Sequence, residues 1–234
     1  MKITEQQLFD YLFCPIKYSL KYDCKIFIRE DITANKLLNQ VTKYFYTSVA
    51  NGKLPTLKQM QSKLDSLCEA NKDIINAKKS VEMWGQVYNF YNWACENKIS
   101  VIDTDTKYSL PLGEHILEGT MNPINITPQK KLETLTINFS NRIPDQIEID
   151  TKLKHTIDIM AFNSSNKELQ ISAARMHLLK QNKDLYATRN INDFKRLEST
   201  VSNVAKSIEN KLYYPRETHM CTSCNYRNYC RAWH

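Results

Sequence analysis

The chain has 234 residues, of which 42% are hydrophobic and 24% are charged, and its formal net charge is +7. These values are typical of a globular protein with one substantial core. The 4 glycines, with no G-x-G-x-x-G or P-loop motif, exclude a glycine-loop nucleotide site. The sequence has no apolar run of membrane-spanning length and starts with the polar stretch MKITEQQLFDY, so neither a transmembrane helix nor a signal peptide is expected.

Helical apolar spacing dominates the first part of the chain. Thr4 and Gln7 form a capping-box pattern that predicts a helical segment over residues 3–22, and Pro15 interrupts this segment just after Cys14. Further helices are predicted over residues 33–49 and, in at least two pieces, over residues 57–97. Aromatic residues at helical spacing in the last segment are more typical of a core than of a base-stacking platform. They are Trp84, Tyr88, Phe90, Tyr91 and Trp93.

Near Ser100 the hydrophobic period changes from helical to alternating. Strands are predicted over residues 100–102, 108–112, 116–126, 132–140 and 168–178. Helices are predicted over residues 151–162, where Asp150 and Thr151 form the expected cap, and 192–210. The order predicts a mixed α/β fold in a single domain, 1–234. Its parts are a mainly helical part (1–97), an α/β core (98–210) and a C-terminal cysteine tail (211–234).

Three cysteines are concentrated in the tail at C-x2-C-x5-C spacing: Cys221, Cys224 and Cys230. A fourth, Cys14, follows an apolar helix start and precedes Pro15. Together they predict a four-thiolate metal site that joins the N-terminus to the C-terminus. The one-plus-three arrangement favours a 4Fe-4S cluster over Zn²⁺, because a structural zinc ribbon usually has two C-x2-C pairs. An odd total of seven cysteines with this spacing favours a reducing compartment, the cytoplasm, over a disulfide scaffold.

The start ITEQQLFDYLFCPIKYSLKY, the tail YYPRETHMCTSCNYRNYCRAW and the strand-helix order between them resemble one branch of the PD-(D/E)xK nucleases. This iron-sulfur branch includes the RecB-like exonucleases of CRISPR adaptation and the AddB-type recombination nucleases. The resemblance covers essentially the whole chain. It implies a restriction-endonuclease-like mixed sheet core flanked by helices, DNA as a partner, and a 4Fe-4S cluster on Cys14, Cys221, Cys224 and Cys230.

The same resemblance implies that the hydrolytic centre is degenerate. Family members carry a histidine in the second helix, an aspartate in a G-x-x-D turn and a D/E-x-K strand. Laid on LLNQVTKYFY, EGTMNPI and LTINFS, this pattern places neutral residues at all of these positions: Asn39, Asn122, Asn138 and Ser140. Amide and hydroxyl groups hold a hard divalent cation far less well than carboxylates, so loss of hydrolysis is expected.

A literal Pro144-Asp145 and Asp150-Thr151-Lys152 leave a second interpretation open. Only four residues separate the two aspartates, too few for adjacent strands of a meander. An acidic loop of Asp145, Glu148 and Asp150 with Lys152 could nevertheless hold Mg²⁺ or Mn²⁺ in an active single-strand DNA exonuclease. Whether the chain is an enzyme is thus left open, with a pseudoenzyme favoured.

The favoured function is a catalytically degenerate iron-sulfur protein that binds DNA or serves as a subunit of a replication, recombination or transcription complex. A third alternative is a structural partner without nucleic-acid affinity. Binding would be largely sequence-independent and made to phosphates. Candidate contacts, chosen from local charge, are Lys152, Lys154, Arg175, Lys180, Arg189, Lys195 and Arg196. The abundance of Asn, Lys, Ile and Tyr is typical of an AT-rich genome, such as a viral one, which would place the protein in the host cytoplasm.

Overall fold

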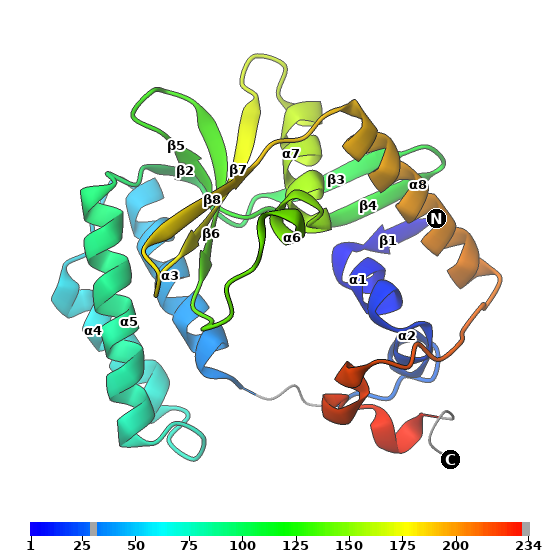
Figure 1. Ribbon diagram of the computed structural model, residues 1–234, viewed down its shortest axis with the longest axis horizontal. Helices are drawn as coiled ribbons and strands as arrows, with labels where there is room; N and C mark the ends of the chain where they lie inside the picture. Colours follow the sequence, from blue (N-terminus) through cyan, green and yellow to red (C-terminus); the bar gives the residue numbers. More distant parts are fainter. Residues whose placement is uncertain (29–31, 231–234) are drawn as a thin grey trace. The chain divides into compact units, whose positions relative to one another are not determined.

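The computed structural model describes residues 1–28 and 32–230, and residues 231–234 of the predicted cysteine tail lie outside that description. The described residues form two compact units (Figure 1). Unit 1 draws on the ranges 1–31, 107–120 and 191–234, and unit 2 on the ranges 32–106 and 121–190. That the chain acts as one nuclease-like domain stays a prediction.

Unit 1 is a small mixed sheet with helices. Its strands are β1 (Lys2–Thr4), β3 (Lys107–Leu112) and β4 (His115–Thr120), in the order β1-β4-β3 with β1 parallel to β4. Its helices are α1 (Glu5–Phe13), α2 (Pro15–Tyr22) and α8 (Ile191–Glu209), followed by the 3-10 turns η1 (His219–Ser223) and η2 (Arg227–Tyr229). Both α1 and α8 pack on β4.

The predicted start of unit 1 is confirmed in detail. Thr4 accepts a hydrogen bond from the Gln7 backbone and Gln7 accepts one from the Thr4 backbone, so the capping box begins α1. Cys14 then adopts an extended backbone (φ −164°, ψ 116°) that ends α1. Pro15 occupies the first turn of α2, where its missing N–H costs no hydrogen bond. The chain therefore kinks at Cys14.

Unit 2 is a five-stranded mixed sheet flanked by helices. The strands are β2 (Val101–Asp103), β5 (Ile124–Ile126), β6 (Leu132–Asn138), β7 (Ile171–Leu178) and β8 (Lys183–Ala187), in the order β2-β5-β6-β7-β8. The helices are α3 (Ala34–Ala50), α4 (Leu57–Glu69), α5 (Ala77–Glu96), α6 (Gln146–Asp150) and α7 (Leu153–Ser165). Strands β6 and β7 are parallel, so the connection between them crosses over through α6 and α7.

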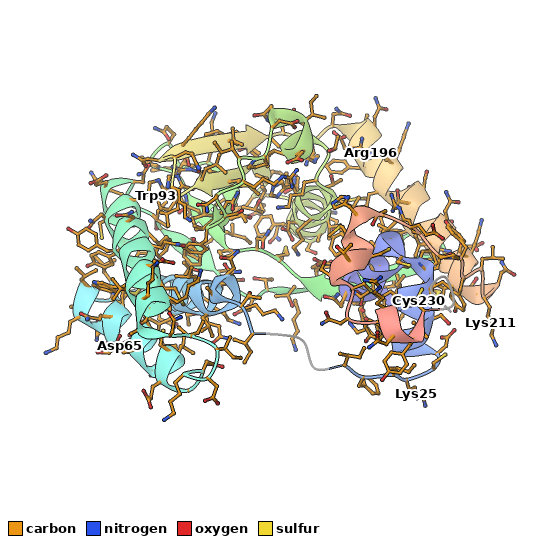
Figure 2. All side chains as sticks on the ribbon, turned by 60° about the horizontal axis from the view of Figure 1, so that its bottom comes forward. Lys25, Asp65, Trp93, Arg196, Lys211 and Cys230 are labelled. Atoms are coloured by element: carbon orange, nitrogen blue, oxygen red, sulfur yellow. The ribbon has the colours of Figure 1, made fainter. Side chains whose placement is uncertain are left out.

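The core of unit 2 lies between its sheet and α3, α4 and α5 (Figure 1). Phe45 and Phe90 are fully buried there with edge-to-face rings, and Trp93 packs beside them. The expectation that these aromatics form a core is confirmed for Phe90 and Trp93, which is labelled in Figure 2. Tyr88, in contrast, is 45% exposed on the outer side of α5.

Two predicted elements have wrong boundaries, and two observed elements were not predicted. Residues 116–126 form β4 and β5 in different units, because Met121, Asn122 and Pro123 interrupt the strand. The helix expected at 151–162 begins at Leu153 without a side-chain cap, so Asp150 does not cap it. Instead Asp145 caps α6, an unpredicted helix, by accepting a hydrogen bond from the Glu148 backbone at 2.7 Å. Strand β8 was also missed.

The mixed α/β class is confirmed, with two mixed sheets flanked by helices. Among the helices in the described ranges, none is both long and apolar enough to cross a membrane.

Candidate nuclease-like centre and cysteine tail

A pocket of about 420 Å³ lies in unit 2 where β6 ends. Strand β6 is central in the sheet, and its last residues line the pocket together with residues of α6 and of the neighbouring strand β7. The polar and charged side chains in its lining are Thr136, Asn138, Ser140, Arg142, Glu148 and Lys152. Two of the four positions that the sequence analysis predicts to be degenerate, Asn138 and Ser140, therefore share this pocket.

Asn138 and Ser140 are engaged in a local turn. The Asn138 carboxamide accepts a hydrogen bond from the Ser140 backbone at 2.8 Å and donates one to the Arg142 carbonyl at 3.3 Å. The Ser140 hydroxyl accepts from the Arg142 backbone at 3.0 Å. Asn and Ser favour such side-chain-to-backbone turns. Both residues thus stabilise the chain reversal after β6.

Asn122 contacts a carboxylate that sequence analysis missed. Its amide donates a hydrogen bond to Asp158 at 2.8 Å. Asp158 lies on α7 with 0% exposure, and Lys154 forms an ion pair with it at 2.8 Å. The signal for Asp158 was present as a single acid within the apolar run of α7, because a buried acid requires partners. A lysine therefore neutralises this carboxylate, and an amide donates a hydrogen bond to one of its oxygens.

Asn39 is not brought to the same place. It is an exposed residue of α3 and is absent from the lining of the pocket that contains Asn138 and Ser140. The side chain at the predicted histidine position therefore has no site role that the described geometry supports.

The acidic residues of the alternative loop each interact with a different partner. Asp145 caps α6, Glu148 pairs with Arg142, and Asp150 accepts a hydrogen bond from Gln146 at 2.9 Å. Within residues 1–28 and 32–230, no three His, Cys, Asp or Glu side chains converge into a group that could hold a metal ion. Only Glu148 and Lys152 of the loop line the pocket.

Positive charge surrounds the start of α7. Burial lowers the pKa of Lys152, and the field of Asp158 opposes this effect. Arg189 donates to the carbonyls of Ile149 and Lys152 at 3.1 and 3.2 Å. Burial, followed by the cations Lys152, Arg189 and Lys154, lowers the pKa of His155 to about 3. His155 is therefore neutral at physiological pH.

Arg175, one of the candidate DNA contacts, is in the interior. It is 7% exposed, pairs with Asp184 at 2.7 Å and Glu133 at 3.4 Å, and lies 5.0 Å over the Trp93 ring. Such a guanidinium stabilises the sheet and is not available to DNA. By contrast Lys180, Lys195 and Arg196 are exposed (Figure 2 labels Arg196).

The four predicted cysteine ligands all belong to unit 1 and are free, half-buried thiols. Each of three ends a short helical element: Cys14 ends α1, Cys224 ends η1 and Cys230 ends η2. The Cys221 sulfur accepts a hydrogen bond from the Thr218 backbone at 3.5 Å. The same sulfur can donate to the Arg216 carbonyl at 3.8 Å. Within the described residues the thiols are not gathered into a group that could hold a metal ion, so the predicted cluster stays a prediction.

The cysteine tail is fastened to the N-terminal helices. The Tyr11 hydroxyl donates to the Leu212 carbonyl at 2.7 Å, and Arg216 donates to the Leu12 carbonyl at 2.5 Å. Farther on, the Tyr226 hydroxyl donates to Ile26 at 3.1 Å. Figure 2 shows Cys230 on the tail beside these helices. The three cysteines of the tail therefore lie on the same side of unit 1 as the kink at Cys14.

No protein-family model matches the chain. Among solved structures, the crystal structure of a "Putative exonuclease" from Eubacterium rectale is similar with a TM-score of 0.59 and 10% sequence identity, over 98% of this chain and 88% of that chain. The structure of SSO0001 covers 94% of this chain and 95% of that chain at 12% identity, but its TM-score of 0.39 is too low to support an argument. The first similarity concerns the fold alone: this chain has a fold similar to that of the "Putative exonuclease".

Proposed function

We propose that the protein is a nuclease-like DNA-binding protein without a working hydrolytic centre, and that its cysteine tail carries a 4Fe-4S cluster. The observation that carries this proposal is the content of the pocket at the end of β6. Asn138 and Ser140 stand there at the positions expected for an acid and a lysine, and both are engaged in the turn after the strand.

Phosphodiester hydrolysis in this class of fold requires carboxylates for Mg²⁺ or Mn²⁺ and a cation near the attacked phosphate. Glu148 is the acid in the described lining of the pocket, and Arg142 is already paired with it. The nearby Asp158 is paired with Lys154. A hard divalent cation would have to displace a protein cation from each carboxylate, which supports a silent centre.

DNA binding through phosphates is supported by the net charge of +7 and by exposed cations on both units, such as Lys180 and Lys195. Contacts to phosphates release counterions, so the affinity should fall steeply with salt and depend little on base sequence. Membership in a larger DNA-processing complex is compatible with the same surface.

A binding and cleavage assay on one labelled single-stranded DNA tests the proposal. Salt-sensitive binding in EDTA, with intact DNA after incubation with Mn²⁺, is the expected result. Mn²⁺-dependent degradation that disappears in EDTA and in Glu148→Gln would instead establish the exonuclease with relocated carboxylates. No binding even at low salt would favour the structural partner.

Restoring charge at the degenerate positions tests the alignment itself. The triple variant Asn122→Asp, Asn138→Asp, Ser140→Lys should bind Mn²⁺ more tightly than the natural protein in a calorimetric titration. The matched control adds two acids at exposed helix positions, Asn35→Asp and Asn89→Asp. Equal Mn²⁺ affinity in the natural protein and the triple variant would contradict the placement of the centre.

The 4Fe-4S cluster would be held by Cys14, Cys221, Cys224 and Cys230. When bound it supplies four metal-thiolate links between the tail and the kink after α1, a structural role. The hydrogen bonds of Arg216 and Tyr226 to the N-terminal segment support this arrangement, because they join the tail to the segment that contains Cys14. Zn²⁺ is the alternative for the same thiolates.

Metal analysis of protein purified without oxygen distinguishes these options. About four irons per chain and a brown colour are expected for one cubane cluster. Cys224→Ser should lose most of the iron, whereas Cys24→Ser, at an exposed cysteine outside the ligand set, should retain it. Iron content unchanged in Cys224→Ser would refute the ligand assignment, and zinc without iron would replace the cluster by a zinc site.

A further inference from the structure

We propose that the pocket at the end of β6 binds a phosphate group directly, through the Lys152 ammonium and the Arg142 guanidinium, without a divalent metal ion. The inference rests on the proposed function for the source of the phosphate, which is a nucleic-acid strand. Its chemistry, however, follows from the pocket alone.

Lys152 is the main reason to expect an anion. It is half-buried in the lining of the pocket, and among the described residues the structure gives its ammonium no hydrogen-bond or ion-pair partner. Partial removal of a lysine side chain from water disfavours its charged form unless an anion lies near it. Burial accordingly lowers the Lys152 pKa, and an anion in the pocket would offset that effect. Lys152 also precedes the first residue of α7, whose N-terminus has no side-chain cap and attracts negative charge.

Arg142 supplies the second cation, at the mouth of the pocket. It pairs with Glu148, but the Arg142 and Glu148 side chains are 75% and 38% exposed. An ion pair this exposed contributes little to stability, so Arg142 can exchange Glu148 for another anion at low cost. A phosphate offers the guanidinium two oxygens in the bidentate geometry that arginine favours. Glu148 is thus a competitor of the anion for Arg142.

Neutral donors complete the pocket. The Thr136 hydroxyl is a buried atom in this lining and lacks a hydrogen-bond partner in the described part of the chain. The Ser140 hydroxyl accepts from the Arg142 backbone and still has its own hydrogen to donate. A volume of about 420 Å³ leaves room for a phosphate with part of its nucleotide. The set of groups suits an anion better than a cation, since donors outnumber acidic acceptors.

Opposite effects of two single-charge changes test the inference. Inorganic phosphate is titrated into the full chain in EDTA, and calorimetry measures its binding. A labelled single-stranded DNA is titrated in parallel. Lys152→Gln should weaken phosphate binding about tenfold, as expected for loss of one charge-assisted hydrogen bond. Glu148→Gln should strengthen it, because Arg142 is released. Lys183→Gln, which removes a charge at an exposed position of β8 outside the pocket, should leave the phosphate affinity unchanged.

Each outcome decides a separate point. Absence of phosphate binding, equal affinity in Lys152→Gln and the natural protein, or binding that needs Mn²⁺ would overturn the inference. If the DNA affinity is the same in the Lys152 and Glu148 variants as in the natural protein, the proposed function stands and the phosphate site in the pocket is refuted. Lys152-dependent binding of inorganic phosphate without DNA binding would establish the pocket and refute nucleic acid as its source. Because Glu148 is on the surface, Glu148→Gln keeps the test decisive even if Lys152→Gln is unstable.

Discussion

The buried His155 predicts that the protein loses stability as the pH falls below about 6.5, the ordinary pKa of histidine. This ring on α7 has 0% exposure, and both of its nitrogens lack hydrogen-bond partners within the described residues. Burial, and then the charges of Lys152, Arg189 and Lys154, lower its pKa to about 3. The folded protein therefore excludes a proton that the unfolded chain binds.

The sign and size of the effect follow from linkage. Between the unfolded pKa of about 6.5 and the folded pKa of about 3, the unfolded state binds more protons, so stability falls as the pH falls. Between pH 7 and pH 5 the loss from this one residue is about 2 kcal/mol. Asp184, whose folded pKa of about 2 lies below its ordinary 3.8, contributes stability that is lost only at more acidic pH. It does not confound this window.

Urea unfolding at pH 7, 6 and 5 measures the effect. His155→Leu, which replaces the ring by an apolar side chain without ionisation, should remove most of the pH dependence. His219→Gln at an exposed histidine should retain it. A His155→Leu variant whose stability falls as steeply as that of the natural protein between pH 7 and 5 would refute the reasoning.

Two further substitutions test the packing of each unit by urea unfolding. Arg175→Ala should lower the free energy of unfolding by about 3–5 kcal/mol, because it leaves Asp184 and Glu133 without their guanidinium partner. The control Arg196→Ala, at an exposed ion pair, should lower it by less than about 1 kcal/mol. Equal losses in the two variants would contradict the buried network. Gly119→Ala should cost about 1–3 kcal/mol, since its methyl group would lie 2.5 Å from the Tyr108 hydroxyl oxygen. Tyr108→Ala removes both the hydroxyl and the ring carbon that the methyl group would meet, so Gly119→Ala should cost less in a Tyr108→Ala background than in the natural protein. Equal costs in the two backgrounds would argue against this contact.

Sequence analysis succeeded where local interactions decide the structure. The capping box of Thr4 and Gln7, the kink at Cys14 and the start of α3 after Thr33 depend on residues within one turn of each other. It failed where the outcome depends on distant partners. The run 116–126 has a continuous strand pattern, and only pairing of β4 with β1 and of β5 with β6 divides it between units.

The candidate site shows the same limit. Asn138 and Ser140 were named from the family resemblance, and the local turn that they form was not predicted. The partner of Asn122 could not be predicted, since Asp158 lies 36 positions later, on the crossover helix. The different partners of Asp145, Glu148 and Asp150 could not be predicted either, because they depend on α6, a five-residue helix without a clear apolar period.

The charges in and around the pocket support a silent centre more strongly than the substitutions alone. A metal-dependent centre keeps carboxylates facing a shared space, where their repulsion is relieved only when the cation arrives. Here each acid already has a protein partner: Asp158 has Lys154, Glu148 has Arg142, and Asp145 has the start of α6. Lys152 belongs to none of these pairs, and it lines the pocket. The charges that line the pocket therefore suit an anion better than a metal cation, as the proposed phosphate site requires.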